Sequence, residues 1–131
     1  MLDTTAGSRP IETAASPVRV LVVDDSAVIR GLMARTLEAA PNISVVASAS
    51  NGEMAVAALK KHAPDVVILD IEMPVLDGLG ALPKLLAADP QVRVVMVSTL
   101  TLRNAEISLR ALSLGAADYL PKPTSTREIS A

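Results

Sequence analysis

The 131-residue sequence contains no cysteine, tryptophan or phenylalanine, and Tyr119 is its only aromatic residue. Without cysteine the chain can form neither a disulfide framework nor a thiolate metal site, and this composition fits the reducing cytoplasm, where we expect the protein. Half of the residues are apolar. The core must therefore be built from Val, Ile, Leu, Ala and Met, a composition that suits buried strands between helices.

The chain also lacks long apolar runs and clusters of basic residues. No apolar stretch approaches the ~20 residues of a membrane-spanning helix, and the N-terminus lacks the charged and apolar segments of a signal peptide. The formal net charge is −2, and no run of Lys or Arg provides the electrostatic footprint of a nucleic-acid-binding protein. We therefore expect neither membrane insertion nor nucleic-acid binding.

Apolar runs and helical periods alternate along most of the sequence. Residues 1–17 are rich in Thr, Ser, Ala, Gly and Pro without a hydrophobic period, which predicts a flexible leader. Strands are expected at 18–23, 43–49, 65–69, 92–97 and 118–120, and helices at about 26–40, 51–62, 79–88 and 103–114. Because Pro83 falls inside the third helical pattern, that helix should either begin near Ala81 or be kinked.

This alternation predicts an α/β fold with a parallel sheet, right-handed crossovers and helices on both faces. After Lys122 and Pro123 only residues 124–131 remain, too few for a fifth helix with an apolar face. One face of the sheet would then lack one of the helices needed to cover it. We expect either a truncated piece of a longer protein, with 124–131 as a tail or the start of the last helix, or a partner that covers this face, including a second copy in a dimer.

Acidic residues follow two of the predicted strands. The run 18–23 ends at Asp24 and Asp25, and the run 66–69 ends at Asp70. At a separation of ~5 Å and an effective dielectric of ~20, each pair of carboxylates would repel by roughly 3 kcal/mol. A hard cation such as Mg²⁺ prefers one or two carboxylates together with water and phosphate oxygens. The pattern therefore predicts a metal-assisted phosphoryl site.

Each candidate residue also has a plain structural interpretation. Asp24 and Asp25 could introduce a helix N-cap, Asp70 could cap a turn, Ser98 could begin a helix and Lys122 could be a solvated charge. Their order favours function, since acid follows the first and third strands, hydroxyl the fourth and ammonium the fifth. All four positions fall at the carboxyl ends of parallel strands, the edge where open α/β sheets bind ligands.

The chain resembles the receiver domain of two-component response regulators in four segments, VLVVDDSAVIR, DVVILDIEMPVLDG, VVMVSTLT and GAADYLPKP. The resemblance covers residues 18–123 and implies a flavodoxin-like, doubly wound sheet of five parallel strands in the order 2-1-3-4-5, here without its last helix. DDSAVIR and the stretches 70–74, 98–101 and 109–112 look most like the chemotaxis-type protein-glutamate methylesterase regulators. In that group the receiver precedes a linker and a hydrolase domain.

The resemblance implies a role for each acidic residue and for the lysine. Asp70 would be the phosphoacceptor, since a carboxylate can form an aspartyl phosphate. Asp25 and Asp70 would bind Mg²⁺ directly, Asp24 mainly through water, and the backbone carbonyl of Glu72 would complete the protein's ligands. Lys122 would place its charge on a phosphoryl oxygen.

The resemblance also implies a switch. Ser98 would hydrogen-bond the phosphoryl group, and Tyr119 would move from exposed to buried when Ser98 is drawn toward the phosphate. Segment 103–120 would then be the output face. Thr99 stands where the family usually has a smaller residue, and its bulk is expected to change the lifetime of the phosphate.

The leading hypothesis is a receiver that a chemotaxis-type histidine kinase phosphorylates on Asp70 with Mg²⁺, and that controls a methylesterase and deamidase domain outside this chain. Such a chain would at most phosphorylate and dephosphorylate itself. One alternative is a stand-alone receiver that binds a motor or a kinase, and another is the receiver of a DNA-binding regulator. A phosphatase of the haloacid dehalogenase type would need a second Asp where Glu72 stands.

Overall fold

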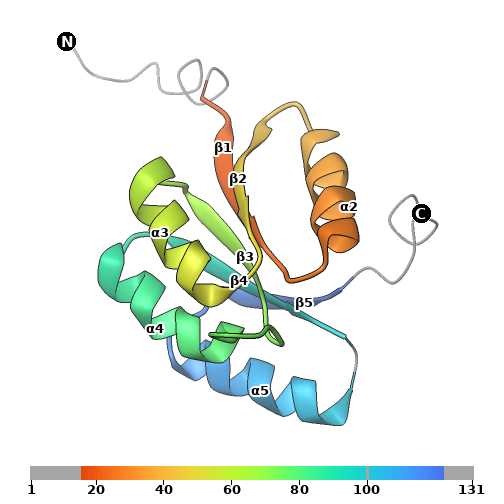
Figure 1. The fold of residues 1–131 in the computed structure, drawn as a ribbon, viewed down its shortest axis with the longest axis vertical. Coiled ribbons are helices and arrows are strands. Elements are labelled where there is room, and N and C mark those ends of the chain that lie inside the picture. The colour runs from red at the N-terminus through yellow and green to blue at the C-terminus, as the bar shows by residue number, and fades with distance from the viewer. Residues whose placement is uncertain (1–15, 100, 123–131) are drawn as a thin grey trace, which may run out of the picture.

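The computed structural model describes residues 16–99 and 101–122, which build one five-stranded sheet in the order β2-β1-β3-β4-β5 (Figure 1). Every neighbouring pair of strands is parallel. The predicted α/β fold and its 2-1-3-4-5 strand order are confirmed. The strands are β1 (Val18–Val23), β2 (Ile43–Ala49), β3 (Val66–Asp70), β4 (Arg93–Ser98) and β5 (Asp118–Pro121).

Four helices lie between the strands in the described part of the chain: α2 (Ala27–Glu38), α3 (Gly52–His62), α4 (Gly78–Ala88) and α5 (Leu102–Ser113). Each begins after a short polar residue whose side-chain oxygen accepts a hydrogen bond from the backbone N–H three positions on, which is the usual N-cap arrangement. These caps are Ser26, Asn51, Asp77 and Thr101.

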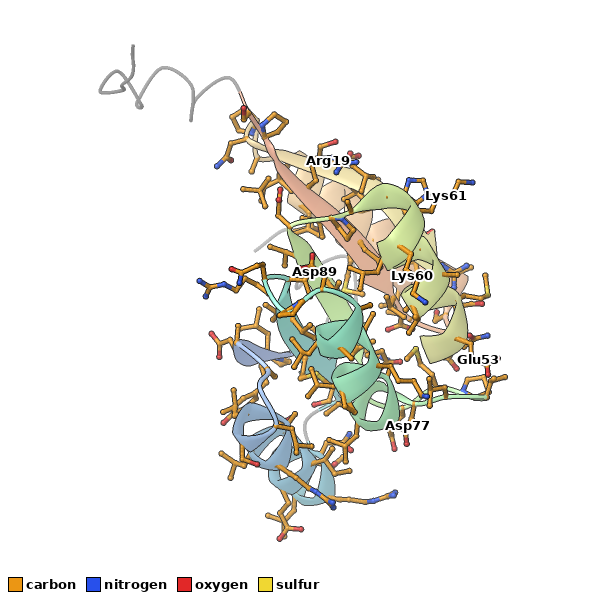
Figure 2. The ribbon with its side chains drawn as sticks, turned by 90° about the vertical axis from the view of Figure 1, so that its left-hand side faces the viewer. Arg19, Glu53, Lys60, Lys61, Asp77 and Asp89 are labelled. Carbon is orange, nitrogen blue, oxygen red and sulfur yellow. The ribbon has the colours of Figure 1, made fainter. Side chains whose placement is uncertain are left out.

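Helix α3 also has charges that complement its dipole (Figure 2). Glu53 lies in its first turn, and Lys60 and Lys61 lie in its last turn. Acidic groups are favoured at the positive N-terminus of a helix and basic groups at its C-terminus. The ends of this helix are therefore stabilised locally as well as by packing.

The sequence left two alternatives for helix α4, a start near Ala81 or a kink at Pro83. It starts at Gly78 rather than near Ala81, so the expectation of a late start was wrong. The Asp77 side chain caps the helix by accepting from the Gly80 N–H at 2.8 Å. Pro83 is exposed inside the helix and lacks the N–H that would bond to the carbonyl four residues earlier. A kink at this position stays a prediction.

The described helices cover the two faces of the sheet unequally (Figure 1). Helices α3, α4 and α5 lie on one face, where their buried side chains pack against Leu21, Leu69 and Met96. Helix α2 lies on the other face and packs Met33 against Val20 and Val22. The larger core therefore lies under α3, α4 and α5.

On the face covered by α2, β3 and β5 keep exposed apolar area. Val66 and Ile68 are only partly buried, and Leu120 is 51% exposed. Among residues 16–99 and 101–122, α2 is the only helix on this face. The predicted absence of a last helix concerns residues 123–131, which lie outside the described residues, as do residues 1–15 of the predicted leader. No helix in the described part of the chain is both long and apolar enough to cross a membrane.

Candidate functional site

The carboxyl ends of four strands bring the predicted site residues to one edge of the sheet. Asp24 follows β1, Asp70 ends β3, Ser98 ends β4 and Lys122 follows β5. The backbone N–H of Lys122 donates to the carbonyl of Ser98 at 2.7 Å, which fixes the end of β5 beside β4. The arrangement predicted from strand order is thus present in the fold.

A lysine lies between two buried carboxylates at the centre of this edge. Lys122 Nζ is 3.1 Å from Asp24 Oδ2 and 3.1 Å from Asp70 Oδ1. The relative exposures are 0% for Asp24, 1% for Asp70 and 14% for the Lys122 side chain. Carboxylate oxygens of Asp24, Asp25 and Asp70 all lie within 4.8 Å of one another. Three carboxylates therefore face one ammonium, an excess of negative charge that burial makes unfavourable.

The environment shifts the pKa values of both Asp70 and Lys122. Burial raises the pKa of the Asp70 carboxyl from 3.8 to about 6, and the negative charge of Asp24 adds to this rise. Lys122 opposes the rise, as does the Glu72 N–H, which donates to Asp70 Oδ1 at 3.3 Å. Burial lowers the pKa of Lys122, but its close contacts with the Asp24 and Asp70 carboxylates outweigh burial and raise the pKa above 10.5. At neutral pH the site thus contains an ionised but poorly compensated Asp70.

Hydrogen bonds at the junction of β1 and α2 orient Asp24. Asp24 Oδ1 accepts from the Ser26 N–H at 2.8 Å, and Ser26 in turn caps α2. Arg30 Nη1 donates to the Asp24 carbonyl oxygen at 2.7 Å. Asp24 is consequently held toward Lys122, whereas Asp25 is exposed at the mouth of the site.

The β3–α4 loop closes tightly against the end of β3. The Gly78 N–H donates to the Ile71 carbonyl at 2.8 Å. A Cβ atom at Gly78 would lie 2.1 Å from the Asp70 carbonyl oxygen, so no other residue fits without displacing Asp70. Glycine at this position therefore fixes the backbone of the site as well as the start of α4.

The same loop contains a strained turn. The Leu76 N–H donates to the Pro74 carbonyl at 2.8 Å around Val75, whose φ is 69°. This three-residue bond with positive φ is the rarer and strained form of the γ-turn. The Leu76 carbonyl accepts from the Gly52 N–H at 2.9 Å, which ties the turn to the start of α3.

The oxygen atoms of the site fit a hard metal ion. Asp70 Oδ2 is buried and accepts no hydrogen bond from any residue in the described part of the chain. Asp24 Oδ2 also lacks a hydrogen bond of good geometry, although Lys122 Nζ lies beside it. With the nearby Asp25 carboxylate, these atoms form an all-oxygen set of the kind that hard divalent cations prefer. The cluster could therefore hold a metal ion.

The two predicted switch residues lie on adjacent strands. Ser98 is 7% exposed at the end of β4, and Tyr119 is 39% exposed in β5, where it pairs with Met96. Tyr119 is thus partly accessible in this conformation. Its movement to a buried position stays a prediction.

Two residues that contact the site or its loops were not anticipated from the sequence. One is Arg30, described above. The other is Asn104, which is 2% exposed and whose side-chain nitrogen donates to the carbonyl and hydroxyl oxygens of Thr99 at 3.2 and 3.0 Å. The only sequence signal for Asn104 was a polar residue within an otherwise periodic helix.

The fold and the site together define a class of signalling domain, one with a doubly wound sheet and a buried acidic pocket suited to accept a phosphoryl group. A family model for the response regulator receiver domain matches residues 20–131, and the chain belongs to this family.

Proteins that are similar to this chain carry the receiver as part of a longer protein. The chain is 68% identical over 113 residues to a protein-glutamate methylesterase/protein-glutamine glutaminase of Azospirillum brasilense. This match covers 86% of this chain and 29% of that protein. It is 60% identical over 126 residues to a protein of the same description from Rhodospirillum rubrum, covering 96% of this chain and 33% of that protein. The chain therefore spans about a third or less of the length of these relatives.

Solved receiver structures agree with the fold. The response regulator domain of Thermotoga maritima CheB is 42% identical with a TM-score of 0.76, over 84% of this chain and 81% of that chain. A CheX-CheY complex with BeF3 and Mg from Borrelia burgdorferi contains a chain that is 30% identical with a TM-score of 0.74, over 88% of this chain and 85% of that chain.

Proposed function

We propose that Asp70 accepts a phosphoryl group from a chemotaxis-type histidine kinase in a reaction that requires Mg²⁺. The observation that supports this best is the state of the Asp70 carboxylate. It is buried at the carboxyl end of β3, one oxygen lies against Lys122, and the other accepts no hydrogen bond from the described residues. A carboxylate placed in this way is available as a nucleophile.

In the proposed transfer, an Asp70 carboxylate oxygen forms a bond to phosphorus while the bond from phosphorus to the histidine nitrogen of the kinase breaks. Lys122 Nζ, 3.1 Å from Asp70 Oδ1, is positioned to stabilise negative charge on the phosphoryl oxygens. The Ser98 hydroxyl would donate a hydrogen bond to the phosphoryl group once it is attached. Each of these contacts matters most as charge develops during the transfer.

Mg²⁺ is the cation that best suits this chemistry, because it binds through one or two carboxylates together with phosphate oxygens and supplies positive charge to the transferring group. Asp25 and Asp70 would bind the ion directly, Asp24 would act mainly through water, and the Glu72 carbonyl would complete the protein's ligands. The mutual distances of the three carboxylates support this assignment. So does the presence of BeF3 and Mg in the similar Borrelia complex.

The phosphorylated receiver would act through segment 103–120, with Tyr119 as part of the switch. Apolar side chains are exposed along α5 and just after it, including Leu109 at 59% and Leu114 at 46%. We infer that residues 18–123 are the receiver, with 1–17 as a leader and 124–131 as a tail or the start of the last helix. The unphosphorylated receiver would obstruct a methylesterase and deamidase domain, and phosphorylation would release that domain.

The relatives favour this regulatory role over a stand-alone receiver, because the similar proteins of Azospirillum and Rhodospirillum are methylesterases about three times as long as the match. Such a regulator would work in the cytoplasm with its kinase. The partly exposed side chains of Val66, Ile68 and Leu120 also support dimerisation through the part of the α2-bearing sheet face that no described helix covers. Light scattering at increasing concentration tests the dimer, and a monomer throughout would contradict it.

Transfer from a radiolabelled, autophosphorylated chemotaxis kinase tests the function. We expect label to move to the wild-type chain in the presence of Mg²⁺ and not to Asp70→Asn. Asp118→Asn is the matched control, since Asp118 is exposed in β5 and outside the acidic cluster. Transfer to Asp70→Asn at the wild-type rate would show that another residue is the acceptor.

A further inference from the structure

One buried side chain connects helix α5 to the loop that follows β4. The Asn104 side-chain nitrogen donates to the Thr99 carbonyl at 3.2 Å and to Thr99 Oγ1 at 3.0 Å. The backbone N–H of the same residue donates to Thr101 Oγ1 at 3.0 Å, so Asn104 also belongs to the cap of α5. Thr99 directly follows Ser98. The first turn of α5 is therefore bonded to the residue next to Ser98, which ends β4 at the edge of the sheet that holds the site.

Two further polar atoms on this side of α5 lack a partner in the described part of the chain. Asn104 Oδ1 and Ser108 Oγ are buried and have no hydrogen-bond partner among the described residues. The two residues are four positions apart and so share one face of the helix. Because burying a polar atom without a hydrogen-bond partner is unfavourable, these two atoms destabilise the present packing of α5.

The packing of α5 does not compensate for this. Its buried residues are Asn104, Ser108 and Ala111, two polar residues and one small apolar residue. By comparison, α4 buries Leu82 and Leu85 completely. Burial of large apolar side chains is the main force that fixes a helix on a sheet. Helix α5 is therefore held by a narrow polar strip and by the partly buried side chains of Ile107 and Leu112, without a fully buried large apolar side chain, and the Asn104 bonds to Thr99 add to what fixes it.

We propose that Asn104 is a positioning residue that latches α5 to the Ser98–Thr99 segment, and that the phosphoryl group on Asp70 opens this latch. When the Ser98 hydroxyl turns toward the phosphoryl group, the adjacent Thr99 moves with it and its two bonds to Asn104 break. Helix α5 is then free to shift. This inference rests on the proposed phosphorylation of Asp70, and it identifies the side chain through which that event reaches α5.

The latch has a consequence for ligand affinity. A ligand shifts a conformational equilibrium only through interactions that differ between the two states. Because the latch bonds exist only in the state without phosphate, their removal should favour the phosphorylated state. Asn104→Ala should therefore bind beryllofluoride, a phosphoryl mimic, about three- to tenfold more tightly in the presence of Mg²⁺, as expected for the loss of one or two neutral hydrogen bonds.

The test is a calorimetric titration of the whole chain with beryllofluoride at saturating Mg²⁺. Thr99→Val, which removes only the hydroxyl and keeps the carbonyl, should tighten binding by about two- to threefold. Combining Thr99→Val with Asn104→Ala should add nothing to Asn104→Ala alone. Ser108→Ala is the matched control, because Ser108 is buried on the same face but makes no hydrogen bond to a described residue. Because Ser108→Ala removes no bond of the latch, its affinity should not rise above that of the wild type.

Circular dichroism shows whether each variant folds. If Asn104→Ala does not fold, the affinity of Thr99→Val tests the latch. Unchanged or weaker binding in the folded Asn104→Ala and Thr99→Val variants would overturn the latch. An equal gain in Ser108→Ala would also overturn it, since that would show general loosening of α5. Wild-type protein that binds no beryllofluoride and accepts no phosphoryl group would instead refute the proposed function.

Discussion

Replacing Asp70 with Asn should stabilise the folded chain at neutral pH when no divalent cation is present. Burial and the charge of Asp24 raise the pKa of Asp70 from 3.8 to about 6 in the folded protein. In the unfolded chain the same carboxyl keeps its ordinary pKa. A difference of about two pKa units corresponds to roughly 3 kcal/mol of unfavourable free energy for the ionised folded state.

The sign of this effect determines its pH dependence. Below about pH 4 the Asp70 carboxyl is protonated in both states, and the penalty is absent. Between about pH 4 and pH 6 the folded protein retains a proton that the unfolded chain has released, so the free energy of unfolding falls as pH rises. Above this window the full penalty persists. Asn is neutral but gives up the ion pair with Lys122, so we expect a net gain of about 1–3 kcal/mol near neutral pH.

Urea unfolding of the wild type and Asp70→Asn, in a metal chelator at about pH 5 and about pH 7.5, measures this difference. The two stabilities should lie closer together at the lower pH and separate at the higher one. Asp25→Asn is the matched control, because Asp25 is exposed and the same substitution there should change stability by no more than about 0.5 kcal/mol. A less stable Asp70→Asn at the higher pH, or an equal difference at both, would refute the reasoning.

Three further predictions follow from the site and its loops. Mg²⁺ at ten times its dissociation constant should stabilise the wild type by about 1.4 kcal/mol and Asp25→Asn by less, as measured by urea unfolding. An equal stabilisation of both proteins would exclude Asp25 as a ligand. Gly78→Ala places a Cβ 2.1 Å from the Asp70 carbonyl oxygen, so it should destabilise the fold by about 2 kcal/mol or more and reduce phosphorylation. In contrast, Gly31→Ala should not destabilise the fold, because its Cβ would meet only Arg35 at 3.7 Å. Equal melting temperatures for Gly78→Ala and Gly31→Ala would contradict this prediction. Val75→Gly should stabilise the fold by about 1 kcal/mol, because Val75 is 74% exposed and its φ of 69° strains a β-branched residue. A lower melting temperature for Val75→Gly would show that the turn is not strained.

The alternation of strands and helices was predictable because the strands are apolar runs, whereas the strand order was predicted from the resemblance to receiver domains. Errors at strand ends were one residue: the predicted β3 and β4 began one residue early, and β3, β4 and β5 ended one residue early. At the ends of β3 and β4 the cause is that Asp70 and Ser98 are polar but their backbones continue the ladder, as in the pairing of Asp70 with Val97. Sequence patterns report side-chain polarity, whereas strand length depends on backbone pairing.

The predicted start of α4, at about residue 79 or near Ala81, was later than the observed start at Gly78 because the sequence signals there are ambiguous. Asp and Gly in sequence favour a turn as strongly as they favour a helix N-cap. The deciding contact is the hydrogen bond from the Gly80 N–H to Asp77, together with the close approach of Gly78 to Asp70. The approach of Gly78 to Asp70 depends on where the loop lies against β3, which local sequence does not encode.

Within the site, the sequence predicted the groups that act through their own side chains and missed those that bind the backbone. Asp24, Asp70 and Lys122 meet because the order of parallel strands brings their ends together. Arg30 and Asn104 each donate to a backbone carbonyl. Any residue supplies such a carbonyl, so no motif marks the pair in advance.

The central claim is that Asp70 accepts a phosphoryl group, and the mass of the intact protein after incubation with Mg²⁺ and a small acyl phosphate tests it most directly. We expect one added phosphoryl group in the wild type and none in Asp70→Asn or in the presence of a metal chelator. Addition of a phosphoryl group to Asp70→Asn, or to the wild type without any divalent cation, would contradict the account.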